Sequence, residues 1–323
     1  MPWNTDIMVG IAEHRTDWLT VFFNVWSDVG DVPGYILIIT FIYGARNRDL
    51  GVRLAVLLLL SICVNHILKT VIMNPRPFAA DGTWQAMWVV SAGHVESLVL
   101  EYSTPSGHAM TAAAFYAYLA LVLRRRWMTI LALCATTLIG LSRPYLGVHY
   151  VEDIVLGWLL GSLTAWIAYR KGDSVAQAWQ KLVWPAQLSL LMAFSTGLWL
   201  FTYTMGGTAP DKPPLSIIGN LGFLTGVALA ASFERRWLGY HAAEGSTLRK
   251  TMRCVLTIGC VALPLVLLGL LADEFVERAS LAGHIFKYIR YAVAGFSGLL
   301  LAPVLFIRLG LAAPPKPAAT ISS

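Results

Sequence analysis

The sequence contains a succession of apolar runs that approach twenty residues in length, separated by short polar segments. An α-helix of about 20 residues crosses the hydrocarbon core of a bilayer, and only a helix or a closed barrel satisfies the backbone there. Charged residues make up only 13% of the chain, against about 25% in a soluble domain. We therefore predict an all-α, polytopic transmembrane helix bundle.

About nine spans are expected, of which the first is short. The aromatic segment 18–26 before it and the loop 78–104 between two spans have the composition of segments that lie at the membrane interface. The predicted spans are 32–43, 54–73, 107–123, 128–141, 151–169, 183–205, 215–233, 254–271 and 288–307.

The distribution of basic residues predicts the orientation of the bundle. If the N-terminus lies outside, the inner loops and the C-terminal tail carry sixteen of the 24 Lys and Arg residues, as the positive-inside rule requires. Because these charges cluster between apolar runs, we expect membrane lipids as partners and no nucleic acid. The short loops and the Ala- and Arg-rich composition are typical of a bacterial inner-membrane protein with a cytoplasmic C-terminus.

Three basic residues depart from this bias in a pattern. Lys69, Arg76 and Arg143 all lie at or near the outer ends of predicted spans. Cations at membrane depth are costly and are usually functional, so three at one end of a bundle predict an anionic ligand. The alternative for each one alone is ordinary interfacial snorkelling.

A short motif, Thr-Pro-Ser-Gly-His at 104–108, directly precedes the third span. Gly107 lets the backbone approach a ligand closely. The first amides of the following helix are unpaired donors at the positive end of the helix dipole. A phosphate group suits such a helix N-terminus.

Two histidines lie at the outer helix ends beside these cations. His149 is followed four residues later by Asp153, so both occupy one helical face, where the carboxylate can fix the imidazole tautomer. This arrangement suits nucleophilic attack on phosphorus, although His108 or His149 taken singly has the alternative of a structural role. The sequence has no metal motif and no carboxylate cluster that would hold magnesium, so we expect metal-independent chemistry without a cofactor.

These residues resemble the three signature motifs of the type 2 phosphatidic acid phosphatase and vanadium haloperoxidase superfamily. The matching stretches are Lys69 through Arg76-Pro77, Pro105-Ser106-Gly107-His108, and Ser142-Arg143 through His149 to Asp153. The resemblance implies that His149 is the nucleophile, that Asp153 orients it and that His108 protonates the leaving oxygen. It also implies a set of phosphate-binding residues: Lys69, Arg76, Ser106, Gly107, Ser142 and Arg143.

The same resemblance implies a six-helix phosphatase core, which we place at 32–205 after an N-terminal interfacial segment at 1–31. Additional transmembrane helices at 206–309 and a disordered tail at 310–323 would follow. The nine-span count, the Ser-Gly-His-Ala-Met sequence at 106–110 and the stretch 212–222 are similar to the glucose-6-phosphatase branch.

The leading functional hypothesis is hydrolysis of a lipid phosphate or a polyprenyl diphosphate, because the site is expected at the level of the headgroups. The glucose-6-phosphatase likeness gives a sugar phosphate as the second hypothesis, and vanadium-dependent haloperoxidation is a third. A non-catalytic lipid transporter or scaffold on the same fold is the alternative from a different class. The motifs recognise only the phosphate, so neither the leaving group nor the oligomeric state follows from them.

Overall fold

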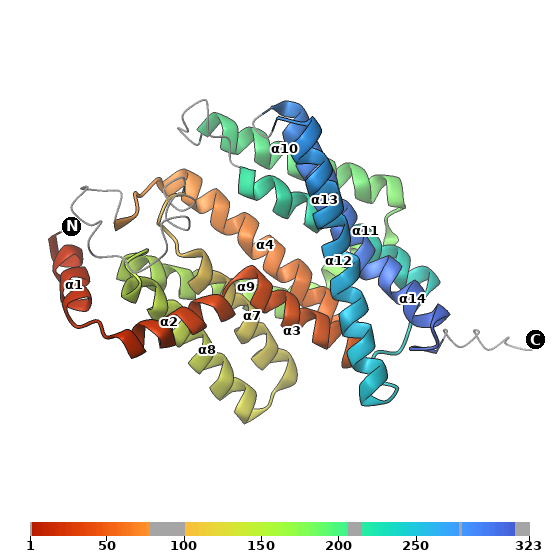
Figure 1. Ribbon diagram of the computed structural model, residues 1–323, viewed down its shortest axis with the longest axis horizontal. Coiled ribbons are helices and arrows are strands. Elements are labelled where there is room, and N and C mark those ends of the chain that lie inside the picture. Colours follow the sequence, from red (N-terminus) through yellow and green to blue (C-terminus); the bar gives the residue numbers. More distant parts are fainter. Residues whose placement is uncertain (1, 78–100, 206–214, 278–279, 314–323) are drawn as a thin grey trace, which may run out of the picture. The chain divides into compact units, whose positions relative to one another are not determined.

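The computed structural model describes residues 2–77, 101–205, 215–277 and 280–313, and every regular element in these ranges is helical. The all-α prediction is therefore confirmed. The elements are α1 (Pro2–Glu13), α2 (Asp17–Val29), α3 (Val32–Ala45), α4 (Arg48–Ile72), α7 (Gly107–Leu123), α8 (Arg126–Tyr145), α9 (Val151–Lys181), α10 (Trp184–Met205), α11 (Leu215–Trp237), α12 (Thr247–Phe275), α13 (Leu281–Phe296), the π-helical η2 (Ser297–Leu301) and α14 (Ala302–Arg308) (Figure 1).

Seven helices in the described ranges are long and apolar enough to cross a membrane, counting Leu281–Arg308 as one. They correspond to seven of the nine predicted spans. The predicted first span forms α3, which is bent by 53° against α2, so this pair makes an eighth span only if the two helices are counted together. The predicted third span forms α7 with the expected bounds, but its 17 residues are fewer than the roughly 20 that a full crossing needs.

The fifth span is longer than predicted. Helix α9 has 31 residues and continues well beyond the predicted end at 169. At 1.5 Å per residue it is roughly 46 Å long, more than the hydrocarbon core requires. Its last part carries Arg170, Lys171 and Asp173, so hydropathy alone placed its end too early.

The chain forms two compact units, described separately below. Unit 1 comprises Met1–Tyr35, Leu57–Ala178 and Thr196–Ile217, and unit 2 comprises Ile36–Val56, Trp179–Ser195 and Ile218–Ser323. Every residue that the sequence analysis predicted for the site belongs to unit 1. The predicted interfacial loop and the C-terminal tail lie largely outside the described residues.

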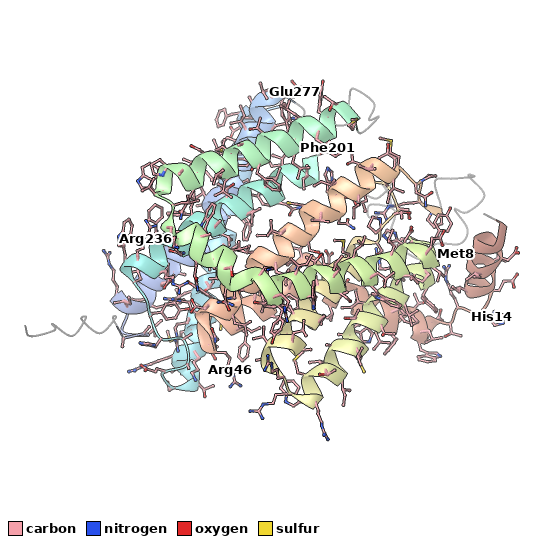
Figure 2. All side chains as sticks on the ribbon, turned by 180° about the vertical axis from the view of Figure 1, so that it is seen from behind. Met8, His14, Arg46, Phe201, Arg236 and Glu277 are labelled. Atoms are coloured by element: carbon pink, nitrogen blue, oxygen red, sulfur yellow. The ribbon has the colours of Figure 1, made fainter. Side chains whose placement is uncertain are left out.

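In unit 1, α7 and α8 run side by side as an antiparallel pair, and α2 packs along α8 (Figure 1). On α1, Met8 is buried in an apolar cluster with Tyr145, Leu146 and Val148, just past the end of α8. His14 at the end of α1 is exposed and points away from the other helices (Figure 2). The N-terminal helices are therefore packed onto the segment that leads to His149.

Helices α7 and α9 approach closely because α9 presents glycines to its neighbour. A Cβ added at Gly157 would lie 2.9 Å from the Ser106 carbonyl oxygen, and one added at Gly161 would collide with the Met110 carbonyl oxygen. Small residues four apart allow this close backbone contact between membrane helices. The spacing fixes the N-terminal turn of α7 against α9.

We expect Gly161→Leu to destabilise the protein by about 3 kcal/mol, because overpacking a tight contact displaces backbone. Thermal unfolding in detergent measures the effect. Gly172→Leu is the matched control, since Gly172 lies on the same helix with nothing within 4 Å of an added Cβ. Equal melting temperatures for the two variants would contradict the packing argument.

Unit 2 contains a similar close contact between α11 and α13. Cβ atoms added at Gly222 or Gly226 would overlap the carbonyl oxygens of Tyr288 or Ala292. An ion pair between Arg48 and the buried Glu234, 3.1 Å apart, joins α4 to α11 in this unit. Buried charges are stable only when they are paired, so this pair fixes the relative position of the two helix ends.

Candidate active site

Four helix ends of unit 1 carry the motif residues. Lys69 lies in the last turn of α4 and Arg143 in the last turn of α8. His108 and Asp153 lie in the first turns of α7 and α9. Motif residues that are far apart in the sequence therefore all lie in the first or last turn of a helix.

His149 and Asp153 form a buried imidazole–carboxylate pair. The Nδ1 atom of His149 lies 3.2 Å from Oδ2 of Asp153, and both side chains are almost completely buried. The backbone N–H of Tyr150 donates to the same carboxylate oxygen over 2.9 Å. Since an ionised carboxylate only accepts hydrogen bonds, Nδ1 carries the proton and Nε2 keeps its lone pair.

Two hydroxyls that the sequence analysis did not assign complete the surroundings of Asp153. Ser103 Oγ donates to Oδ2 over 2.5 Å, and Thr104 Oγ1 donates to Oδ1. Both carboxylate oxygens are therefore hydrogen-bonded, and the side chain is held in one orientation. The signal was present in the sequence as two hydroxyl residues directly before the Pro-Ser-Gly-His motif.

Arg76 contacts the other side of the His149 ring. Its Nη1 atom lies 3.1 Å from His149 Nε2 and donates to the Val148 carbonyl over 3.1 Å, while its Nε donates to the Glu101 carbonyl over 3.0 Å. Burial, together with the positive charges of Arg76 and Lys69, holds the pKa of His149 well below its usual value of 6.5. The imidazole is therefore neutral at physiological pH, as a nucleophile requires.

Arg143 is 1% exposed. Its Nη1 donates to Ser27 Oγ on α2 over 2.5 Å, whereas its Nε is buried and has no hydrogen-bond partner among the described residues. A buried guanidinium donor that lacks an acceptor is costly. Its free donor makes Arg143 suited to an anionic ligand. Ser27 was not predicted, because nothing in its local sequence indicates a contact more than 100 residues away.

Lys69 and Arg76 share one carboxylate. Glu101 Oε2 lies 3.2 Å from Lys69 Nζ and 3.3 Å from Arg76 Nη2. The ammonium group of Lys69, and to a smaller extent the guanidinium of Arg76, lowers the pKa of Glu101. This acidic residue was also missed, because it lies in the sequence between two motifs and belongs to neither.

The N-terminal turn of α7 supplies further polar groups. Ser106 is buried and caps the helix by accepting from the Ala109 N–H over 3.5 Å. A Cβ added at the next residue, Gly107, would lie 3.3 Å from Asn65 Oδ1. His108 is partly exposed, and the charges of Arg143, Arg76 and Lys69 act on it electrostatically.

Ser142 has a different environment from the other predicted residues. Its hydroxyl is completely buried and donates to the Ile139 carbonyl of its own helix over 2.7 Å. Among the described contacts it is the backbone of α8 that Ser142 engages.

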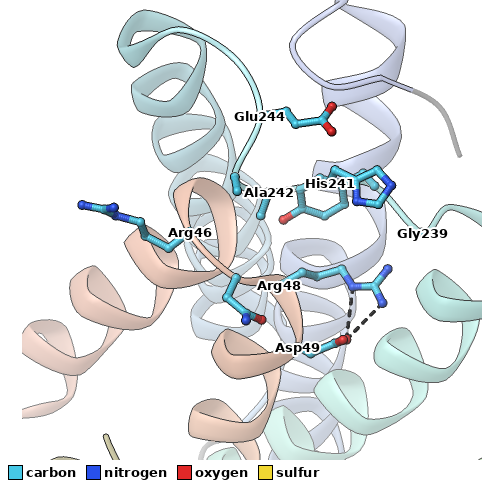
Figure 3. A pocket seen from close by; sticks show the side chains of 10 residues that line it. Arg46, Arg48, Asp49, Gly239, His241, Ala242 and Glu244 are labelled. Atoms are coloured by element: carbon cyan, nitrogen blue, oxygen red, sulfur yellow. Dashed lines mark hydrogen bonds and ion pairs between the residues drawn. The ribbon is translucent and has the colours of Figure 1, made fainter. Parts of the chain in front are cut away.

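A separate polar cavity of about 320 Å³ lies in unit 2, lined by residues 46–49 and 239–244 (Figure 3). Arg48 in its wall is already paired with Asp49 and Glu234. No residue that the sequence analysis predicted for the site lines this cavity.

The fold and the unit 1 site define a polytopic membrane protein in which buried cationic side chains lie around a neutral histidine that a carboxylate orients. A family model described as the PAP2 superfamily matches residues 50–174, and one described as "PAP2 superfamily phosphatase, transmembrane extension" matches residues 218–314. The chain belongs to the PAP2 superfamily and is an integral membrane protein.

The curated relatives are named as lipid phosphatases. The chain is 32% identical over 138 residues to an undecaprenyl-diphosphatase of Sulfolobus acidocaldarius, a match that covers 43% of this chain and 60% of the relative. It therefore spans less than two thirds of that relative's length. It is 24% identical to sphingosine-1-phosphate phosphatase 1 of Mus musculus, over 91% of this chain and 73% of the relative.

A solved structure is also similar. It is the transmembrane PAP2-type phosphatidylglycerolphosphate phosphatase of Bacillus subtilis, with 25% identity, a TM-score of 0.44, and coverage of 54% of this chain and 85% of that one.

Proposed function

We propose that the protein is a metal-independent phosphatase that hydrolyses a lipid phosphate or a polyprenyl diphosphate through a phosphohistidine intermediate. One observation carries the proposal: His149 Nε2 lies 3.1 Å from Arg76 Nη1 while Asp153 holds Nδ1. A phosphoryl group bound by Arg76 would therefore meet a neutral nucleophile in a fixed orientation.

In the proposed reaction, the lone pair of His149 Nε2 attacks phosphorus as the bond from phosphorus to the leaving oxygen breaks. His108 gives a proton to that oxygen. The guanidinium and ammonium groups, with the first amides of α7, stabilise the charge on the equatorial oxygens. Water then gives a proton to His108 and attacks phosphorus, and the bond between phosphorus and His149 Nε2 breaks, which frees the imidazole and orthophosphate. The proposed phosphoryl-binding set is Lys69, Arg76, Ser106, Gly107, Ser142 and Arg143, in which Ser142 would have to turn its hydroxyl away from the Ile139 carbonyl.

The names of the relatives support a lipid substrate. The polyprenyl and sphingoid enzymes both act on a phosphate attached to a long apolar chain, as their names state. A substrate of this kind stays in the bilayer, and we expect a site at the ends of membrane helices to lie at headgroup depth. We therefore place lipid phosphates ahead of sugar phosphates.

Release of inorganic phosphate by the purified protein in detergent, with EDTA present, tests the proposal. Phosphatidic acid, sphingosine 1-phosphate, phosphatidylglycerophosphate and undecaprenyl diphosphate form the lipid panel, and glucose 6-phosphate is the soluble comparison. We expect at least one lipid to be turned over about 100-fold faster than the sugar phosphate. No release without added Mg²⁺, or a preference for the sugar, would refute the corresponding part of the proposal.

We also propose that the site faces the outer side of a bacterial inner membrane, with the C-terminus in the cytoplasm. The support is the excess of basic residues in the alternate set of loops. The core at 32–205 would then carry the chemistry, and the helices at 206–309 would extend it. Labelling single cysteines placed at His14 and Arg308 in a cysteine-free background from either side of intact cells tests this topology.

A further inference from the structure

Glu101 occupies the position in which an anionic ligand would meet Lys69 and Arg76. One oxygen of its carboxylate bridges both cations, at 3.2 and 3.3 Å. The side chain of Glu101 is 42% exposed, whereas those of Lys69 and Arg76 are only 10% and 2% exposed. The carboxylate therefore reaches buried cations from the accessible side.

Of the two cations, Arg76 does not depend on the Glu101 carboxylate for its position. Arg76 donates to the backbone carbonyls of Glu101 and Val148, and these bonds persist if the carboxylate moves away. Its Nη1 also remains beside His149 Nε2. Displacement of the carboxylate would thus free Lys69 Nζ and Arg76 Nη2 next to the nucleophile.

We propose that Glu101 is an internal competitor for the phosphoryl site: its carboxylate closes the Lys69–Arg76 pair, and every anion must displace it to bind. This inference rests on the proposed function. It assigns Glu101 a role in weakening the binding of every anion by one common factor, which leaves weak ligands unbound and aids release of the product.

The consequence for substrate class follows from charge. A membrane phosphatase is surrounded by phosphodiester headgroups, whose phosphate carries one negative charge. A terminal phosphate carries about −1.5 to −2 at pH 7. When a diester replaces the carboxylate, the negative charge beside the cation pair stays the same. When a terminal phosphate replaces it, that negative charge increases. Diesters are therefore the weaker ligands of the cation pair, and a loss of affinity that is common to all anions leaves them unbound while terminal phosphates still bind. The same loss helps to release orthophosphate after hydrolysis.

In a fixed fraction of the molecules, the Glu101 carboxylate occupies the cation pair, and we call this fraction the closed population. It lowers the apparent affinity of all ligands by one common factor. Removal of the competitor should consequently raise the affinity for orthophosphate, for vanadate and for a phosphodiester by the same factor. A residue that contacts the ligand directly, or one that only stabilises the fold, has no reason to produce this uniform change. The common factor is the signature of the proposed role.

The test compares Glu101→Gln with the wild-type full-length protein in detergent. Inhibition constants of orthophosphate, orthovanadate and dihexanoyl-phosphatidylglycerol are measured against hydrolysis of a lipid phosphate. We expect all three to fall about tenfold, the factor that a closed population of about 90% implies. Glu277→Gln makes the same charge change at an exposed site (Figure 2) and should leave them unchanged.

Constants that stay within twofold of wild type, that rise, or that change by different factors would overturn the inference. If Glu101→Gln is not recovered as folded protein, Glu101→Asp keeps the charge but withdraws the carboxylate by one methylene, and it should shift the constants in the same direction by less. Calorimetric binding of the three anions in a His149→Ala background gives the same comparison without turnover. A wild-type protein that hydrolyses no phosphate would refute the proposed function, while this binding comparison would still decide the role of Glu101.

Discussion

Replacement of His149 by alanine is expected to reduce the turnover of the best lipid phosphate by about 10⁵-fold. The proposed intermediate forms on its Nε2 atom, which no other described side chain replaces beside Arg76. Losses of this size follow removal of a nucleophile or its base in other hydrolases. Single-turnover phosphate release measures the first consequence. Trapping of an acid-labile phosphoprotein from radiolabelled substrate, with an alkaline denaturing quench, measures the second.

His14→Ala is the matched control for this prediction. His14 is exposed at the end of α1, and its ring contacts only the Gly10 carbonyl of its own helix among the described contacts. The control should retain wild-type turnover and the trapped phosphoprotein. Substantial turnover in His149→Ala, or a phosphoprotein with the acid stability of a phosphoserine, would exclude His149 as the nucleophile.

Replacement of Asp153 by asparagine is expected to lower kcat about 10³-fold while KM changes little. The amide oxygen can still accept from Thr104 Oγ1, and the Ser103 hydroxyl can turn to accept from the NH₂ group, so the packing survives. Its NH₂ group, however, would face His149 Nδ1 and favour the tautomer that carries the proton on Nε2. A protonated Nε2 cannot attack phosphorus, and an equivalent exchange in a Ser-His-Asp triad costs about 10⁴-fold.

Glu152→Gln provides the comparison, because it makes the same carboxylate-to-amide change one residue earlier in the first turn of α9. We expect its kcat to stay within a few fold of wild type. The split between kcat and KM separates a positioning role from a general loss of folded protein. A large rise in KM with unchanged kcat in Asp153→Asn would show that Asp153 binds substrate and does not orient His149.

The fold was predictable to the extent that it depends on the local composition of each segment. Apolar runs placed seven spans correctly, because in lipid every backbone group must be paired within its own helix. The predicted span at 32–43 became α3, which is bent by 53° against α2, and the one at 107–123 became a 17-residue helix. Both positions depend on packing with neighbouring helices, which hydropathy does not contain.

Part of the site was predictable from the sequence, and part appeared only in the structure. His149, Asp153 and Arg76 follow from motif spacing, and the structure brings them into one contact network. Glu101 and Ser27 were not predicted. Their contacts to motif residues, Glu101 Oε2 to Arg76 Nη2 and Ser27 Oγ to Arg143 Nη1, join segments with no common local pattern.

The sequence by itself determined that this protein lies in a membrane and which reactive side chains it carries at the ends of its helices. A chain with long apolar runs must form membrane helices, and cations and imidazoles at the ends of such helices predict a ligand, because charges at membrane depth are costly. Only the tertiary structure decided which donor faces which acceptor: that Asp153 holds Nδ1, that Arg76 meets Nε2, and that Glu101 covers the cation pair. The physical reason is that hydrogen bonds depend on distances of about 3 Å, and helix packing sets these distances between residues that lie far apart in the chain.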